Sequence, residues 1–364
     1  MRLATRLPAW SLISPIVSWI VLTLALTGYR TTPSWLYELL VVVGLVLGIL
    51  AAVFHAEVVA HRVGEPYGTL VLALAVTAIE VALIVSLMVA GGEGANGLAR
   101  DAVFASVMII LNGMVGICLL TGGQRHGEQH FGLYGVSAAL ATLAAISVLT
   151  LVLPNYTTTT SGPEYSRGQL TFIVVVSLVL YGTFLMIQTV RHRDYFLPVE
   201  SVADEAVHAQ PPSRKMAILS AVFLFACLGA VVLLAKTLSP AIEEVVGEIG
   251  APKTLVGIII AAVVLLPESI AAYQAARANR LQTSLNLALG SALASIGLTI
   301  PAVSLVSLIA GWSITLGIDE KSTVLLLLSL LVASLSLGTG RTTVMQGTVH
   351  LVIFAVYLFT AVIP

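Results

Sequence analysis

Charged residues are scarce in this sequence. Lys, Arg, Asp and Glu make up 10% of its 364 residues, whereas hydrophobic residues make up 58%. A soluble domain carries about 25% charged residues. So few charges cannot cover the surface of a water-soluble fold, and the mean hydropathy of +1.02 agrees with this. The composition therefore indicates a polytopic membrane protein, with the lipid bilayer as its surroundings.

The sequence also lacks an excess of basic residues and is poor in cysteine. It has 17 basic against 18 acidic residues, a net charge of −1. Without a basic stripe, nucleic acid is not expected as a partner. The two cysteines, Cys118 and Cys227, both lie in apolar runs, so we expect neither a disulfide nor a metal framework.

Long apolar runs dominate what is present. A transmembrane helix needs about 20 apolar residues, and continuous rather than alternating runs exclude a β-barrel. The start of the chain resembles a signal peptide but has no convincing small-residue cleavage site, so we predict a retained first helix. The sequence predicts an all-α protein with about eleven transmembrane helices. They lie near residues 9–28, 37–60, 67–90, 102–121, 132–153, 168–190, 216–238, 254–276, 284–310, 322–338 and 343–362.

The distribution of Lys and Arg predicts an orientation. Of the 17 basic residues, 11 fall on the side of the N-terminus and 6 on the other side. The positive-inside rule then predicts a multi-pass protein of the cell's inner membrane, with the N-terminus in the cytoplasm and the C-terminus outside. We divide the chain into a first transmembrane helix (1–33), repeat 1 (34–190, helices 2–6), a cytoplasmic linker (191–214) and repeat 2 (215–364, helices 7–11).

A short motif marks the two repeats. The stretches "EVVAHRVGEP" (57–66) and "EEVVGEIGAP" (243–252) both fit Glu-x6-Gly-x-Pro, and each precedes an apolar helix with one central glutamate. These glutamates are Glu80 and Glu268. Because each repeat has five helices, the second enters the membrane with the opposite orientation, and we expect the two carboxylates to converge near the midplane. Inverted repeats of this kind are typical of secondary transporters.

A carboxylate in an apolar helix needs a physical reason. An ionised side chain there is costly, so it normally faces a partner or a water-filled cavity. Burial favours the protonated form, and a cation and a proton can then compete for the same oxygens. The paired glutamates therefore predict a cation/proton exchange site. The alternative interpretation is a permanently protonated glutamate that bonds to a neighbouring helix.

Neighbouring residues offer further oxygen ligands. Pro267 has no amide hydrogen for the carbonyl of Val263, so we expect a kink that opens the backbone, and Pro301 could do the same to Gly297. Carbonyl and carboxylate oxygens suit Ca²⁺ or Na⁺ rather than Zn²⁺ or Cu²⁺. The neutral side chains in reach are Thr77, Asn112, Asn286, Ser291 and Ser295. Such groups also join membrane helices without touching an ion.

Three more acidic residues are predicted at the ends of the path. Glu57, Glu243 and Glu244 would form acidic mouths that concentrate cations, or would be solvated helix ends. The nearby "HAEVVAH" (55–61) is not a zinc-protease motif, because its histidines are six rather than four residues apart. Since no nucleophile–base pair is found either, we expect no enzyme and no resident cofactor.

Two stretches carry a resemblance to a known family. They are "HAEVVAHRVGEPYGTLVLALAVTAIEVALIV" and "LLPESIAAYQAARANRLQTSLNLALGSALASIGLTIP". They resemble the two signature regions of the cation/Ca²⁺ exchanger superfamily, and are similar above all to bacterial Ca²⁺/H⁺ antiporters of the ChaA type. The resemblance implies that Glu80 and Glu268 bind the transported cation. It also places Asn112, Gly290 and Ser291 on the helices that complete the site.

The chain departs from the broader group at the residues before each glutamate. It reads "VTAIE" (76–80) and "VLLPE" (264–268) in place of Gly-Asn-Ala-x-Glu, so Thr77 and Leu265 stand where asparagines would be. The resemblance implies a secondary active transporter that exports Ca²⁺ in exchange for protons, with Na⁺/H⁺ or K⁺/H⁺ antiport on the same scaffold as the alternative. Inorganic cations and protons are the expected partners, and a homo-oligomer is compatible with the sequence.

Overall fold

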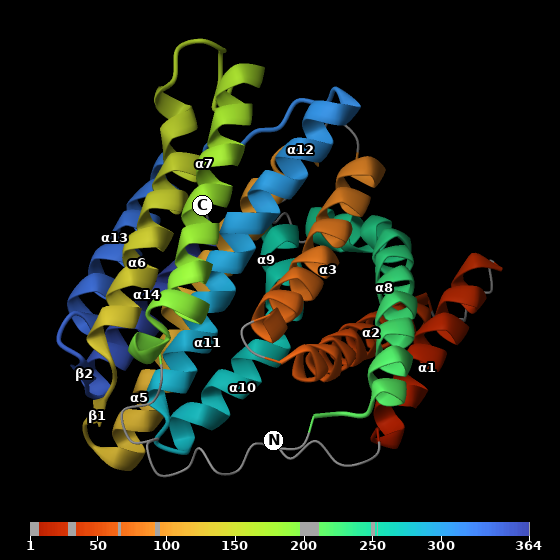
Figure 1. Cartoon of the computed structure of the whole chain (residues 1–364). Helices are drawn as coiled ribbons and strands as arrows, with labels where there is room; N and C mark the ends of the chain where they lie inside the picture. Colours follow the sequence, from red (N-terminus) through yellow and green to blue (C-terminus); the bar gives the residue numbers. More distant parts are fainter. Residues whose placement is uncertain are drawn as a thin grey trace. The chain divides into compact units, whose positions relative to one another are not determined.

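The structure is a computed structural model that describes residues 7–27, 34–64, 67–91, 95–196, 211–248, 252 and 254–363. Its long elements are all helices (Figure 1). The α-helices are α1 (Ala9–Leu26), α2 (Ser34–Val63), α3 (Tyr67–Gly91), α4 (Leu98–Met108), α5 (Val115–His126), α6 (Leu133–Ser147), α7 (Arg167–Met186), α8 (Arg214–Glu248), α9 (Thr254–Val264), α10 (Leu266–Arg277), α11 (Leu281–Ala294), α12 (Ile300–Ala310), α13 (Glu320–Leu337) and α14 (Val344–Val362).

Several helices continue through short segments of different geometry. The π-helices are η2 (Ile109–Met114), η3 (Val148–Val152), η5 (Ile187–Arg191) and η8 (Ser295–Thr299), and the 3₁₀-helices are η4 (Leu153–Tyr156) and η6 (Arg193–Phe196). Two-residue strands, β1 (Gln129–His130) and β2 (Arg341–Thr342), pair antiparallel, with Gln129 opposite Thr342.

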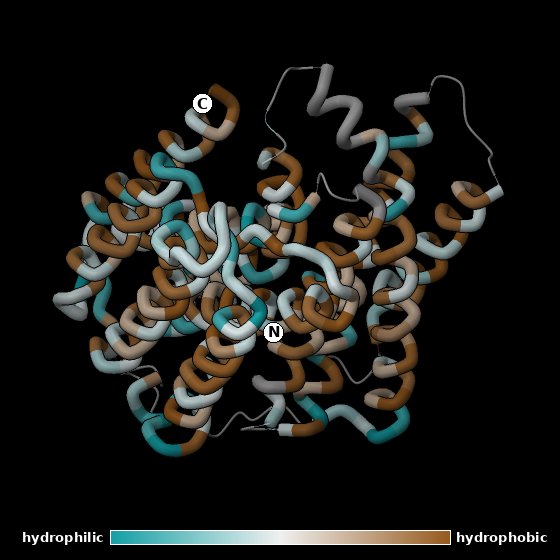
Figure 2. The backbone as a smooth tube through the Cα atoms, turned by 90° about the horizontal axis from the view of Figure 1, so that it is seen from above, coloured by the Kyte–Doolittle hydropathy of each residue, from teal (hydrophilic) through white to brown (hydrophobic). Residues whose placement is uncertain are grey.

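The prediction of about eleven transmembrane helices is confirmed. Among the described residues, ten helices are long and apolar enough to cross a membrane, and the bent pair α9–α10 makes an eleventh when taken as one span. Each falls on one of the apolar runs of the sequence. Apolar residues follow the helices, whereas hydrophilic residues gather at helix ends and connections (Figure 2). This is the distribution that a bilayer requires, since a helix satisfies all its internal backbone hydrogen bonds.

Contacts between helices divide the chain into two compact units. Unit 1 comprises Met1–Ala95 and Ala206–Gly250, and unit 2 comprises Asn96–Glu205 and Ala251–Pro364. Each unit thus combines segments from both halves of the sequence. The two predicted repeats, by contrast, are consecutive segments of the sequence on either side of the 191–214 linker, and this assignment stays a prediction.

Unit 1 consists of α1, α2, α3 and α8, with α2 packed against the other three. Small residues allow the close approach: a Cβ on Gly48 would lie 2.9 Å from the Val231 side chain of α8. Polar bonds join α1 to its neighbours, since the Ser18 hydroxyl donates to the Gly44 carbonyl and the Trp19 indole donates to the Ala226 carbonyl. These hydrogen bonds hold α1 against α2 and α8.

Unit 2 holds the remaining helices, connected by short turns. The turn between α10 and α11 uses Asn279 in a left-handed conformation, with φ at 58°, a conformation that Asn tolerates better than most residues. The Asn279 side chain accepts a hydrogen bond from the Gln129 amide of β1 at 2.9 Å. The β1–β2 pair and this turn therefore lie together at one end of the unit.

Parts of the sequence motifs lie outside the described residues. These are Pro66 and Gly250 of the repeated motif, and residues 197–210 of the predicted linker.

Candidate cation site

Glu268 lies at a break in a membrane helix of unit 2. Helix α9 ends at Val264, α10 begins at Leu266, and the two are bent by 55°. Pro267 is in the first turn of α10, so the amide that would bond to the Val263 carbonyl is missing, as the sequence predicts. Glu268 follows in the same turn, where the helix dipole favours negative charge. Broken membrane helices place helix ends and carbonyls within reach of ions.

Two π-helices lie in the helices that follow the glutamates in sequence. Asn112 is in η2, between α4 and α5, and Ser295 is the first residue of η8, between α11 and α12. Both residues are buried. In unit 2, η2 packs against α11 and α10, and α4 packs against η8. The elements that carry Asn112, Ser295 and Glu268 are thus packed together, and α11 also carries the half-buried Ser291.

Pro301 lies within one continuous span. Residues 281–310 form a single span in which the π-helix η8 directly precedes the proline. A π-helical turn shifts the hydrogen-bonding register of a helix. The possible opening at the Gly297 carbonyl stays a prediction.

The amide of Asn112 belongs to a buried polar network that the sequence analysis missed. Its nitrogen donates to the Ser329 hydroxyl of α13 at 2.8 Å, and its oxygen lies 3.3 Å from Nδ1 of His350 in α14. Nε2 of His350 lies 2.8 Å from the Ser336 hydroxyl. His350 has no exposed surface. A signal was present: residues 344–362 contain no Asp, Glu, Lys or Arg, so a lone histidine there resembles the lone glutamate in α3.

Glu80 and Thr77 belong to unit 1. Both lie in the middle of α3 and are buried, with exposed fractions of 5% and 6%. Helix α3 packs against α2 and α8, and Glu57 is half-buried in α2, inside a span. Since Glu80 and Glu268 are described in separate units, their convergence at one site stays a prediction. The side chains of Glu243 and Glu244, the other predicted mouths, lie outside the described part of the chain.

Two polar residues of the sequence analysis have structural partners away from the π-helices. Asn286 donates to the Phe196 carbonyl and accepts from Gln282, which ties α11 to the end of the 191–196 segment. His55 is buried, bonds to the Ser11 carbonyl at 2.9 Å and stacks on Phe223. It therefore packs α1 against α2 and α8. No group of three His, Cys, Asp or Glu side chains within the described ranges is arranged to hold a metal ion.

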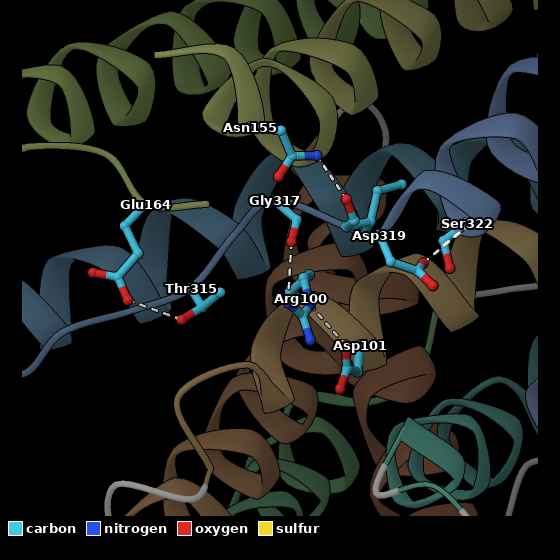
Figure 3. A network of polar contacts seen from close by, with 9 residues as sticks. Arg100, Asp101, Asn155, Glu164, Thr315, Gly317, Asp319 and Ser322 are labelled. Atoms are coloured by element: carbon cyan, nitrogen blue, oxygen red, sulfur yellow. Dashed lines mark hydrogen bonds and ion pairs between the residues drawn. The ribbon is translucent and has the colours of Figure 1, made fainter. Parts of the chain in front are cut away.

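A second polar cluster surrounds the segment between α12 and α13 in unit 2 (Figure 3). Arg100 donates to the Gly317 carbonyl at 3.0 Å and forms an ion pair with Asp101 at 2.7 Å. Asn155 donates to the Ile318 carbonyl at 2.6 Å. A pocket of about 190 Å³ lies beside these residues, lined by Asp101 and Asp319 but also by Arg100 and Lys321. Because both signs of charge line it, this pocket is not a dedicated cation site.

The comparisons with known proteins agree with the fold. The model of the sodium/calcium exchanger protein family matches residues 33–190 and 219–363. The chain is 47% identical over 362 residues to y4hA of Sinorhizobium fredii (strain NBRC 101917 / NGR234), whose name calls it an ionic transporter, with 99% of this chain and 98% of that protein covered. It is 34% identical over 358 residues to the sodium-potassium/proton antiporter ChaA of Escherichia coli (strain K12), with 98% and 97% covered.

A solved structure shows the same fold at low sequence identity. The structure of native YfkE, a protein named as a Ca²⁺/H⁺ antiporter, aligns with a TM-score of 0.74 and 17% identity. The alignment covers 98% of this chain and 100% of that chain. The family model and the 34% identity to an antiporter together define the class: a multi-pass membrane transporter of inorganic cations. Within that class, the chain belongs to the sodium/calcium exchanger family.

Proposed function

We propose that this protein is a proton-coupled cation antiporter of the inner membrane, in which a cation and protons compete for Glu80 and Glu268. The observation that carries the proposal is the position of Glu268 in the first turn of α10, after the 55° break at Leu265. A carboxylate at an interrupted membrane helix has open backbone groups beside it, whereas a purely structural glutamate does not need them.

Exchange would follow from the competition between the two ions. With protons bound, both glutamates are neutral, which is the inexpensive state in a membrane interior. A cation that enters must displace them, because the same oxygens hold either species. The site would then open to the other side of the membrane with either protons or a cation bound, but not with both. Thr77, Asn112, Ser291 and Ser295 would supply neutral oxygens, and Glu57, Glu243 and Glu244 would line the approaches.

Ca²⁺ is the first candidate for the transported cation. Two carboxylates at one site neutralise a divalent ion, and oxygen-rich Ca²⁺ sites depend on such charge. Na⁺ or K⁺ is the second candidate, and a specific observation favours it: the chain is 34% identical over nearly its full length to a sodium-potassium/proton antiporter. The absence of amide oxygens at Thr77 and Leu265 supports the same alternative.

Proton flux in vesicles tests the proposal. The purified protein is reconstituted with a proton gradient, and Ca²⁺, Na⁺ or K⁺ is added separately. We expect Ca²⁺ to dissipate the gradient at a lower concentration than Na⁺ or K⁺. A monovalent ion that acts at an equal or lower concentration selects the second candidate. No flux with any of the three refutes antiport of these ions.

The same assay on Glu80→Gln and Glu268→Gln tests the site. Glutamine keeps nearly the shape of a protonated glutamate but can neither release a proton nor present a negative charge. We therefore expect each variant to lose exchange while its yield and its melting temperature in detergent are retained. The matched control is Glu57→Gln, which should change the apparent affinity and leave the maximal rate largely intact. Substantial exchange in either of the first two variants would exclude the proposed role.

A further inference from the structure

The pocket beside Arg100 lies where four membrane helices of unit 2 begin or end. Each of α4, α9, α13 and α14 contributes a residue of its terminal turn to the lining: Asp101, Thr254, Lys321 and Thr360. At about 1.5 Å per residue, the 18 residues of α13 span about 27 Å, close to the thickness of the hydrocarbon core. The pocket therefore lies at the level of the lipid headgroups.

The basic groups of the lining are held by backbone carbonyls. Nζ of Lys321 donates to the Thr360 carbonyl at 2.8 Å, and Arg100 donates to the Gly317 carbonyl at 3.0 Å (Figure 3). An ammonium group has three N–H donors, so Lys321 keeps two of them for a ligand. Ser322, in the same turn of α13, adds a hydroxyl to the lining. These donors suit an anionic oxygen such as that of a phosphate.

The acidic groups of the lining are only partly used. Oδ1 of Asp101 pairs with Arg100, and Oδ1 of Asp319 accepts from the Ser322 amide. In the described part of the chain, the second oxygen of each carboxylate has no hydrogen bond, and neither has the Tyr357 hydroxyl. Tyr357 is only 4% exposed, lines the pocket and lies within electrostatic reach of Asp101. Because a buried tyrosine hydroxyl usually has a partner, this oxygen indicates the place of a ligand.

Apolar side chains continue from the pocket along α13 and α14. The exposed residues recur every three or four positions, at Val324, Leu328, Leu331 and Leu335 of α13 and at Val352, Val356 and Phe359 of α14. This spacing places each set on one face of its helix, and the two helices pack against each other. Val324 lies three residues after Lys321, so the apolar stripe of α13 begins directly below the pocket.

We propose that this pocket binds a phospholipid whose headgroup carries a primary ammonium group. The phosphate binds at Lys321 and Ser322, and the acyl chains follow the stripes of α13 and α14. The ammonium donates to the free oxygens of Asp101, Asp319 and Tyr357, three acceptors for three N–H groups. Such a zwitterion matches both signs of charge in the pocket. A choline headgroup has the same charges but no N–H, and it would leave these oxygens without partners, which is costly.

Short-chain phospholipids added to the purified protein in detergent test the headgroup. A ligand that binds the native state raises the melting temperature, and the half-saturating concentration of this rise reports affinity. The lipids are the dihexanoyl forms of phosphatidylethanolamine, phosphatidylcholine and phosphatidylglycerol. We expect phosphatidylethanolamine to half-saturate at a concentration about tenfold lower than the other two, because only it makes the ammonium hydrogen bonds. An equal or lower value for either of the others would overturn the proposal.

The headgroup without its chains separates a lipid from a soluble zwitterion. O-phosphoethanolamine carries the same charges and the same N–H groups. We expect it to need a concentration at least about tenfold higher than the lipid, since it buries no apolar chain on the stripes. Equal half-saturating concentrations would show that the stripes contribute nothing and that the ligand is not a lipid.

Tyr357→Phe tests the site itself, because it removes an oxygen that has no protein partner. We expect its melting temperature without lipid to equal that of wild type, and its half-saturating concentration of phosphatidylethanolamine to rise about fivefold. The matched control is Tyr181→Phe: Tyr181 of α7 is buried outside the pocket, and its hydroxyl is also without a hydrogen bond to the described residues. It should bind the lipid as wild type does. Equal lipid binding by Tyr357→Phe and Tyr181→Phe would exclude the assigned pocket.

Asp319→Asn tests the charge without removing the helix cap. Asparagine caps a helix as well as aspartate does, so α13 should keep its start, whereas the negative charge for the ammonium is lost. We expect the half-saturating concentration of phosphatidylethanolamine to rise about tenfold and to approach that of phosphatidylcholine. Retained preference for phosphatidylethanolamine in this variant would contradict the placing of the ammonium. None of these measurements depends on antiport, so their outcome is independent of the proposed function.

Discussion

At the scale of single residues, close helix packing in unit 2 depends on glycine. A Cβ on Gly347 of α14 would lie 2.8 Å from the Leu120 Cα and 2.9 Å from the Gly116 carbonyl oxygen of α5. Both are backbone atoms and cannot rotate away. We therefore expect Gly347→Ala to destabilise the protein by about 1–3 kcal/mol, the usual cost of overpacking. A lowered melting temperature in detergent is the measurement.

A matched control exists in α7. A Cβ on Gly182 would meet nothing within 4 Å. Since alanine is the better helix former, Gly182→Ala should leave the melting temperature unchanged or raise it slightly. Equal decreases of the melting temperature in Gly347→Ala and Gly182→Ala would contradict the close contact between α5 and α14 at Gly347.

At the scale of elements, the break between α9 and α10 is maintained by Pro267. In Pro267→Ala, a backbone amide becomes available for the Val263 carbonyl, so the helix can continue through Leu265. We expect a straighter α9–α10 and a loss of exchange, because Glu268 would then sit in an uninterrupted helix. Spin labels at the exposed residues Ile259 and Gln274 measure the bend. Their separation should increase in the variant.

Pro301→Ala is the control for this experiment, because Pro301 follows η8 within a single span. It should leave the distance between the two labels in α9 and α10 at its wild-type value. An unchanged distance in Pro267→Ala as well would mean that packing of α10 against α5 and α11, rather than the proline, maintains the bend.

At the scale of the whole molecule, the topology is the open prediction. The excess of basic residues on one side and the eleven spans together require that the 191–214 linker and the C-terminus lie on opposite sides of the membrane. Reporter fusions after Gln210 and after Pro364 measure this, with the linker expected in the cytoplasm. Two reporters on the same side would show that one of the spans does not cross, and the bent pair α9–α10 would be the first to re-examine.

The spans were predictable because the thickness of the bilayer fixes the length of an apolar run. The break at Pro267 was predictable because a missing amide has one consequence in a helix. The π-helix around Asn112 was not, since a shifted hydrogen-bonding register leaves no simple mark in composition. The hydrogen-bond partners of Asn112 could not be predicted either, because Ser329 and His350 are more than 200 residues away in sequence. His350 itself carried the same signal as Glu80, a lone titratable group among apolar residues.

The buried polar network around Asn112 has a consequence for leakage. A proton wire needs every member to accept a proton on one side and release one on the other. The Ser329 and Ser336 hydroxyls at the two ends of the network donate to the Leu325 and Val332 carbonyls, which have no hydrogen to pass on. The network is therefore a dead end for conduction. In the proposed mechanism, protons leave only by the carboxylates of Glu80 and Glu268, which is the condition for an exchanger that does not leak protons across the membrane.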